Sequence, residues 1–258
     1  MADQTGANQD GGFHWRGYIF RPALGPTMLT VLGMVFMVLL GSWEVQRLFW
    51  KQDLINTSQS RFAALLVTPP PANADSVTVG EFEFYRVRIE GMFLHDHEMF
   101  LAARSLMSHL GYHVITPLQR ADGSLVLVDR GWVPLDYKDP ASRAAAQIEG
   151  TVWLEGVIRV DGRKSRFTLD NVPEENFWFY VDLPAMASYV GQDPFASWYV
   201  EASATPNPGG FPVGGQSKLD LPNDHLQYAL TWYSLVLALF VIYLIYNNKG
   251  AENSAYIA

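Results

Sequence analysis

A long uncharged segment near the end of the chain most restricts what this sequence can fold into. Residues 226–246 read LQYALTWYSLVLALFVIYLIY and contain no charged side chain. At a rise of about 1.5 Å per residue, a helix of this length spans about 30 Å, the thickness of a bilayer's hydrocarbon core. Tyrosine and tryptophan gather towards both of its ends, as they do where membrane helices cross the interfaces. We therefore predict a membrane-spanning helix over residues 223–247 rather than a buried helix of a soluble domain.

A second, shorter apolar segment lies near the start of the chain. Residues 27–43 read TMLTVLGMVFMVLLGSW, about 17 residues without a charge, which is at the short end of what crosses a bilayer. Arg16 and Arg21 precede it, as in a secretory signal peptide, but no clear Ala-x-Ala-like cleavage site follows. We expect an uncleaved anchor over residues 25–46.

The charges beside the two segments suggest an orientation. Arg16 and Arg21 favour the cytoplasmic side for the tails at residues 1–24 and 248–258. Arg47 lies on the opposite flank, but long loops cross a membrane largely regardless of charge. Residues 47–222 should then face the periplasm or an equivalent compartment, while residues 1–12 read as disordered.

Composition excludes several partners and chemistries. The net charge of −8 and the absence of a dense Lys/Arg tract argue against nucleic acid as a partner. The chain has no cysteine, so disulfides, thiolate metal ligands and a cysteine nucleophile are impossible. With acids at Asp3 and Asp10 and no Arg/Ser-rich leader, the start of the chain favours a bacterial plasma membrane over an organelle.

The region between the two segments is rich in strand patterns. Residues 86–93 alternate between apolar and polar side chains, and so do residues 152–160. Shorter β-rich runs lie at residues 99–102, 112–117, 125–128, 177–181 and 198–200. We predict an α+β membrane protein in which two transmembrane helices flank a β-rich extracytoplasmic domain, built as an antiparallel sheet or a partly open barrel.

Helical signal in this region is sparse. It falls at residues 56–66, 141–147 and 184–190, and the Pro/Gly-rich residues 205–215 read as a connector to the second span. No Rossmann, P-loop or Gly-x-Ser-x-Gly motif occurs, so we expect no enzyme. His95 and His97 could share a strand face near His109 and His113 as a metal site, although hairpin or surface histidines explain the pattern better, because no further ligand spacing is diagnostic.

Four motifs resemble the Surfeit-locus family of cytochrome c oxidase assembly factors. The first is LGSWEVQR at residues 40–47, where the family more often has Gln at the position of Glu44. The second and third are GYHVITPL at residues 111–118 and LVDRGWVP at residues 127–134, where Asn is more usual than Asp129. The fourth, PNDHLQYALTWY, covers residues 222–233 and opens the second span.

The resemblance implies a two-span protein of the bacterial plasma membrane or the mitochondrial inner membrane that assists assembly of the haem–copper (aa3-type) oxidase. It implies transient binding of haem a and its placement in oxidase subunit I, with His225 as the iron ligand. Subunit I is therefore the expected partner, and haem A synthase is a further candidate. A scaffold that stabilises an oxidase intermediate without binding haem is the alternative.

The residues around His225 agree with a haem site in type. Imidazole is a common axial ligand of haem iron, and small residues allow a flat macrocycle to approach. Helical spacing places His225, Tyr228, Ala229 and Trp232 in one stripe. Interfacial anchoring of the aromatic residues explains the same stripe without a ligand.

The first span carries a comparable stripe at its outer end. Trp43, Gln46, Arg47 and Trp50 fall along it, and we expect the two stripes to oppose each other. Arg47 is a candidate partner for a haem propionate, because guanidinium suits carboxylates. Anchoring at headgroup depth is again the simpler alternative.

The Arg130-Gly131-Trp132 element follows an apolar strand. We interpret it first as structural, with Gly131 permitting a bulge or a close backbone approach. In the alternative interpretation, these three residues bind the oxidase subunit through an exposed Trp132.

Overall fold

The computed structural model describes residues 13–15, 18–20, 22–160, 162, 164–217 and 222–250. Predictions that concern residues 1–12, Arg16 and Arg21 lie outside this described part. The chain divides into two compact units, one formed by residues 1–54 and 222–258 and the other by residues 55–221.

The two apolar segments form long helices, α1 (Leu24–Ala63) and α4 (His225–Asn247). Both are long and apolar enough to cross a membrane. Helix α1 continues unbroken from the predicted first span through most of the helix expected at residues 56–66, because no proline or glycine follows Gly41 within it. At about 1.5 Å per residue it is about 60 Å long, twice the thickness of a bilayer core.

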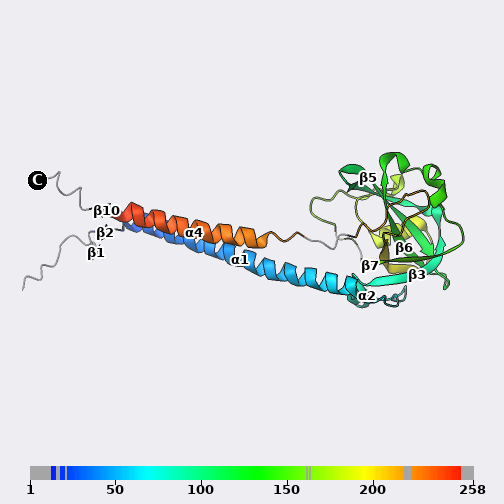
Figure 1. Cartoon of the computed structure of the whole chain (residues 1–258), viewed down its shortest axis with the longest axis horizontal. Coiled ribbons are helices and arrows are strands. Elements are labelled where there is room, and N and C mark those ends of the chain that lie inside the picture. The colour runs from blue at the N-terminus through cyan, green and yellow to red at the C-terminus, as the bar shows by residue number, and fades with distance from the viewer. Residues whose placement is uncertain are drawn as a thin grey trace, which may run out of the picture. The chain divides into compact units, whose positions relative to one another are not determined.

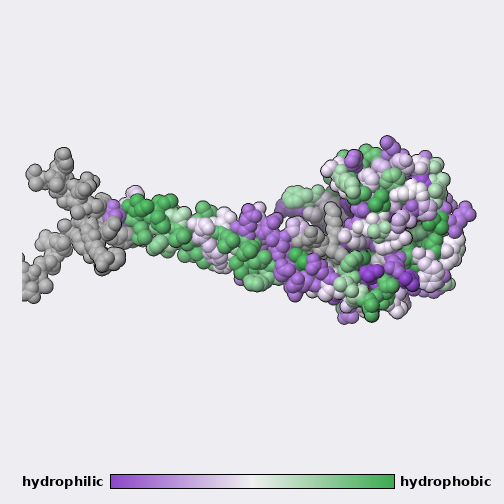
Figure 2. Space-filling view, viewed as in Figure 1, coloured by the Kyte–Doolittle hydropathy of each residue, from purple (hydrophilic) through white to green (hydrophobic). Residues whose placement is uncertain are grey.

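Helices α1 and α4 lie side by side and antiparallel (Figure 1). Thr27 Oγ1 lies 2.8 Å from the Tyr243 hydroxyl near one end, and Ser42 Oγ lies 3.3 Å from the Tyr233 hydroxyl further along. Gly41 is buried against the Tyr233 ring, so the backbone of α1 comes close to α4 there. Figure 2 shows large apolar side chains exposed along the pair, as a lipid-facing surface requires.

Short strands lie next to the start of α1 and the end of α4. The strands β1 (Phe13–Trp15), β2 (Tyr18–Phe20) and β10 (Asn248–Gly250) form one antiparallel sheet with β2 in its centre. This sheet joins the segment before α1 to the segment after α4.

The second unit is a closed five-stranded barrel with two further strands. Its strand order is β3-β7-β9-β6-β5-β4-β8, and an additional pairing of β3 with β5 closes the barrel. The strands are β3 (Arg86–Phe93), β4 (Met99–Leu106), β5 (His109–Gln119), β6 (Leu125–Pro134), β7 (Thr151–Arg159), β8 (Phe177–Trp178) and β9 (Phe195–Ala202). The prediction of an α+β fold is confirmed, and the barrel is closed rather than partly open.

Alternation along the strands builds the barrel interior. Val87 and Ile89 of β3 pack with Val128 of β6 and with Trp198 and Val200 of β9 in one buried cluster. Strands β3 and β7 are antiparallel throughout, whereas β6 and β9 are parallel. Parallel neighbours need a long crossover, which here contains β7, β8 and α3.

Helix α3 (Leu183–Val190) covers part of the barrel and confirms the helix predicted at residues 184–190. Asp182 caps its start by accepting a hydrogen bond from the Ala185 N–H at 3.1 Å, and Gly191 ends it in the left-handed conformation. Helix α2 (Ser76–Phe82), capped in the same way by Asp75, was not predicted.

Four short 3-10 helices complete the described part. They are η1 (His95–His97), η2 (Leu135–Tyr137), η3 (Pro140–Ala146) and η4 (Pro173–Glu175). The helix predicted at residues 141–147 is therefore a 3-10 segment. His95 and His97 lie in η1, so the expectation that they share a strand face was wrong.

Candidate functional site

The candidate site lies where α4 begins against α1. His225 is the first residue of α4, and its ring Nδ1 lies 2.7 Å from Oε2 of Glu44 on α1. Glu44 is 9% exposed, and the side chain of His225 is 23% exposed. A carboxylate buried between apolar helices needs a charged or hydrogen-bonding partner, and His225 supplies one.

The contact determines how the imidazole is arranged. An ionised carboxylate only accepts hydrogen bonds, and such a Glu44 pairs with the tautomer of His225 that carries its proton on Nδ1. Within the described part of the chain, Nε2 of His225 has no protein hydrogen-bond partner. In the neutral ring Nε2 then holds the lone pair, which is the atom that binds a metal.

The predicted stripe on α4 divides between two environments. Ala229, one turn after His225, is 2% exposed and lies in the helix contact, and Trp232 is half-buried. Tyr228 is instead 57% exposed. The structure therefore keeps Ala229 and Trp232 on the side of His225 that faces α1, whereas Tyr228 projects from the flank of the helix pair.

The predicted stripe on α1 does not face His225. Trp43 and Trp50 are 51% and 56% exposed, and Arg47 stacks between them, with its guanidinium carbon 5.9 Å from the Trp43 ring centre and 4.6 Å from that of Trp50. Glu44 occupies the facing position, so the expectation that the two stripes oppose each other was wrong. An α-helix advances about 100° per residue, which turns these three side chains away from the line of contact.

Helical geometry nevertheless places Tyr228 on the same side of the pair as the α1 stripe. Arg47 follows Glu44 by three residues, and Tyr228 follows His225 by three residues. Because the helices are antiparallel, the same step along each rotates both side chains towards the same flank. A guanidinium, three aromatic rings and the His225 imidazole thus border one surface.

The Arg130-Gly131-Trp132 element lies in the second unit, in β6, and is buried. Arg130 is 2% exposed and Trp132 is 6% exposed, so the alternative that an exposed Trp132 contacts a partner does not fit. Gly131 has a φ of +113°, and an added Cβ there would lie 2.0 Å from the Val213 carbonyl oxygen. The structural interpretation is confirmed, because the connector at residues 205–215 approaches β6 at this glycine.

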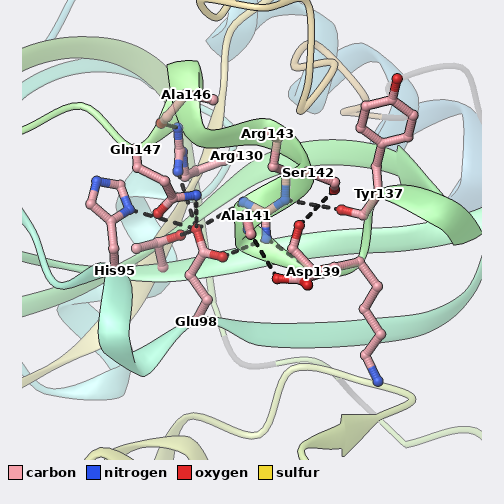
Figure 3. Close-up of polar contacts among 12 residues, drawn as sticks. His95, Glu98, Arg130, Tyr137, Asp139, Ala141, Ser142, Arg143, Ala146 and Gln147 are labelled. Carbon is pink, nitrogen blue, oxygen red and sulfur yellow. Dashed lines mark hydrogen bonds and ion pairs between the residues drawn. The ribbon is translucent and has the colours of Figure 1, made fainter.

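Arg130 belongs to a buried ionic cluster that the sequence did not predict (Figure 3). Glu98 accepts hydrogen bonds from Arg130 Nη1 at 3.3 Å and from Arg143 at 3.1 and 2.5 Å. Gln147 Nε2 lies 3.4 Å from Oε1 of the same carboxylate, and His95 Nδ1 lies 3.6 Å from that oxygen. Arg130 also donates to the Ala146 carbonyl at 2.5 Å, so the cluster attaches the η3 segment to the barrel wall.

The charges of the cluster determine its protonation. Burial alone would raise the pKa of Glu98, but hydrogen bonds from His95 and Arg143 and the charges of Arg143 and Arg130 lower that pKa to about 2. Burial lowers the pKa of Arg130 to about 10. At neutral pH Glu98 and Arg130 are therefore charged, and each is only 2% exposed at its side chain.

Two other histidines of the described residues contact oxygen atoms of the protein. His95 Nε2 lies 3.0 Å from the Ile148 carbonyl oxygen, and His113 Nδ1 lies 2.8 Å from Asp129 Oδ2. Among the described residues, no group of three or more His, Asp or Glu side chains could hold a metal ion. A haem iron that takes one imidazole from the protein does not need such a group.

Glu44 is the functional candidate that sequence reasoning missed. A signal was present, because Glu44 is the only acidic residue from Leu24 to Gln52. A lone carboxylate near an apolar span predicts a nearby partner. The sequence could not indicate which residue of the distant α4 faces it.

Comparison with known proteins gives one consistent family. The model of the SURF1 family matches residues 31–237. A SURF1-like protein of Monosiga brevicollis is 37% identical over 228 residues, covering 83% of this chain and 85% of that protein. Surfeit locus protein 1 of Homo sapiens is 36% identical over 215 residues, covering 77% of this chain and 70% of that protein. The mouse protein of the same name is also 36% identical, over 214 residues.

Proposed function

Because this chain belongs to the SURF1 family, we propose that it is a membrane-anchored assembly factor for haem–copper cytochrome c oxidase. In this proposal it is not an enzyme. It binds haem a transiently and assists the insertion of haem a into oxidase subunit I. The observation that carries the haem-binding part is His225, whose Nδ1 is held by Glu44 while Nε2 has no protein partner among the described residues.

The residues around His225 fit a haem as cargo. Imidazole is a common axial ligand of haem iron, and the His225 side chain is 23% exposed. Trp43, Trp50 and Tyr228 offer exposed aromatic surface on the flank that Arg47 also borders. Arg47 would donate charge-assisted hydrogen bonds to a propionate, since guanidinium suits carboxylates.

Haem binding is tested in a host that makes haem a. The wild type, His225→Ala and His109→Ala are purified in detergent, and reduced-minus-oxidised visible spectra are recorded. His109 lies exposed in β5, so its removal controls for the loss of any histidine. We expect a haem a spectrum in the wild type and His109→Ala that is lost or shifted in His225→Ala.

A colourless wild type that still captures oxidase subunit I would favour the alternative, a scaffold that never binds haem. Arg47→Ala is examined in parallel. Unchanged haem affinity and an unchanged spectrum in that variant would remove Arg47 from the site while leaving His225 as ligand.

We further propose that both helices span the bacterial plasma membrane, with the barrel in the periplasm and both tails in the cytoplasm. The absence of native cysteine makes this testable by labelling. Met107, 86% exposed at a hairpin tip, becomes the single cysteine of one variant, and Glu252 becomes that of a second. A membrane-impermeant maleimide applied to spheroplasts should label Met107→Cys, and it should label Glu252→Cys only after permeabilisation. The reverse pattern would overturn the orientation.

A further inference from the structure

Glu44 and His225 form a pair whose chemistry goes beyond simple helix contact. The 2.7 Å bond joins Glu44 Oε2 to Nδ1, one of two chemically distinct ring nitrogens. Among the described residues, Glu44 and His225 form an ion pair with each other and with no other side chain. Such a pair resembles the carboxylate–histidine arrangement by which proteins orient a metal-binding imidazole.

Burial makes the contact persistent. Glu44 is 9% exposed, and the adjoining Ala229 is 2% exposed, so little water competes for the carboxylate. Helix α4 begins at His225, and Asp224 makes no side-chain capping bond to it. The orientation of the imidazole therefore depends on α1, a different element, rather than on the local turn of α4.

We infer that Glu44 is a positioning residue that holds His225 in the tautomer with the proton on Nδ1, leaving the Nε2 lone pair for a haem iron. The haem iron in this inference rests on the proposed function. The tautomer of His225 does not, because it depends only on the contact with Glu44. A second consequence is electronic. The negative charge of Glu44 adds electron density to the imidazole, which makes Nε2 a stronger donor and favours ferric over ferrous iron.

Two substitutions separate the hydrogen bond from the charge. Glu44→Gln keeps an acceptor oxygen but loses the negative charge, whereas Glu44→Leu loses both. Asp53→Asn is the matched control, because Asp53 is an exposed acid on the same helix, about 13 Å further along by helical rise. It removes one negative charge without touching His225.

The first measurement needs no haem. Nitrogen-15 NMR of histidine-labelled protein in detergent distinguishes a protonated ring nitrogen from an unprotonated one, and His225→Ala assigns the signal among six histidines. We expect Nδ1 protonated and Nε2 unprotonated in the wild type and Asp53→Asn, and a tautomer mixture in Glu44→Leu. A wild-type ring with both nitrogens protonated, or an unchanged tautomer in Glu44→Leu, would overturn the inference.

The second measurement uses haem a titration and a redox titration of the loaded protein. Glu44→Leu should bind haem about 10- to 100-fold more weakly. Glu44→Gln should bind nearly as the wild type does but with a raised iron midpoint potential, and Asp53→Asn should match the wild type in both. If haem binds through His225 and neither Glu44 variant changes affinity or potential, the role of Glu44 is refuted while the proposed function stands. If the wild type binds no haem, the haem-binding function itself fails.

Discussion

Arg143 binds Glu98 through both terminal nitrogens of its guanidinium, at 3.1 and 2.5 Å, and each of the two side chains is 2% exposed. The geometry is bidentate, and Arg143 also donates from Nε to the Tyr137 carbonyl at 3.0 Å. One arginine thus connects β4, through Glu98 at its edge, to the segment after β6 (Figure 3).

Truncating this arginine should destabilise the barrel strongly. Arg143→Ala leaves Glu98 buried with only part of its compensation, which typically costs about 3–5 kcal/mol of unfolding free energy. This loss of unfolding free energy can be measured by urea unfolding, monitored through the fluorescence of the buried Trp178 and Trp198. Arg88→Ala is the control, because Arg88 pairs with Glu155 in an exposed bridge, and its loss should leave stability near that of the wild type.

The free energy of unfolding should decrease at acidic pH, in part because Glu98 becomes protonated. The pKa of Glu98 is lowered from 4.5 to about 2, so the folded state binds this proton less readily than the unfolded chain does. The contribution, about 3 kcal/mol, is present above pH 4.5 and lost as the pH falls towards 2. Unfolding free energies between pH 6 and pH 3 should fall more steeply in the wild type than in Glu98→Gln.

Should Glu98→Gln not fold, the carboxyl group can be titrated directly by carbon-13 NMR in the wild type. A midpoint near 4.5 would contradict the expected effect of the two arginines. A midpoint well below that value would support it.

Gly131 should tolerate no side chain. Its φ of +113° and the nearby Val213 carbonyl predict that Gly131→Ala costs about 3 kcal/mol or more. Gly123 also has positive φ, +81°, but an added Cβ there meets no atom within 4 Å. Gly123→Ala should therefore cost about 1–2 kcal/mol, from backbone strain alone. If Gly131→Ala and Gly123→Ala lose the same free energy of unfolding in urea, the close approach of the connector at Gly131 does not affect stability.

The helix pair should depend on Gly41. A Cβ at this position would lie 3.0 Å from the Tyr233 ring, so Gly41→Leu should force the helices apart at a cost of about 1–3 kcal/mol. Hydrogen exchange of α4 amides in detergent should become faster around Tyr233. Gly25→Leu is the control, because nothing lies within 4 Å of a Cβ there, and unchanged exchange in both variants would contradict the close packing.

Much of the fold could be predicted because its signals are local. The two spans follow from uncharged runs of bilayer length, and β3 begins and ends at the predicted residues because its side chains alternate. Asp182 and Gly191 mark the ends of α3 by ordinary capping rules. Barrel closure was missed, since the pairing of Phe93 with Leu118 joins strands that no local pattern relates.

The sequence by itself determined the two apolar helices, the β-rich domain between them, the family motifs and the position of His225 near the start of the second span. Only the tertiary structure decided that Glu44 faces His225, that Arg47 lies on the flank, and that Arg130 and Trp132 are buried. The physical reason is that hydrophobic patterning and capping act within a few residues of the chain. The partner of a buried charge is instead selected by packing between segments that lie far apart in sequence, as Glu44 and His225 do.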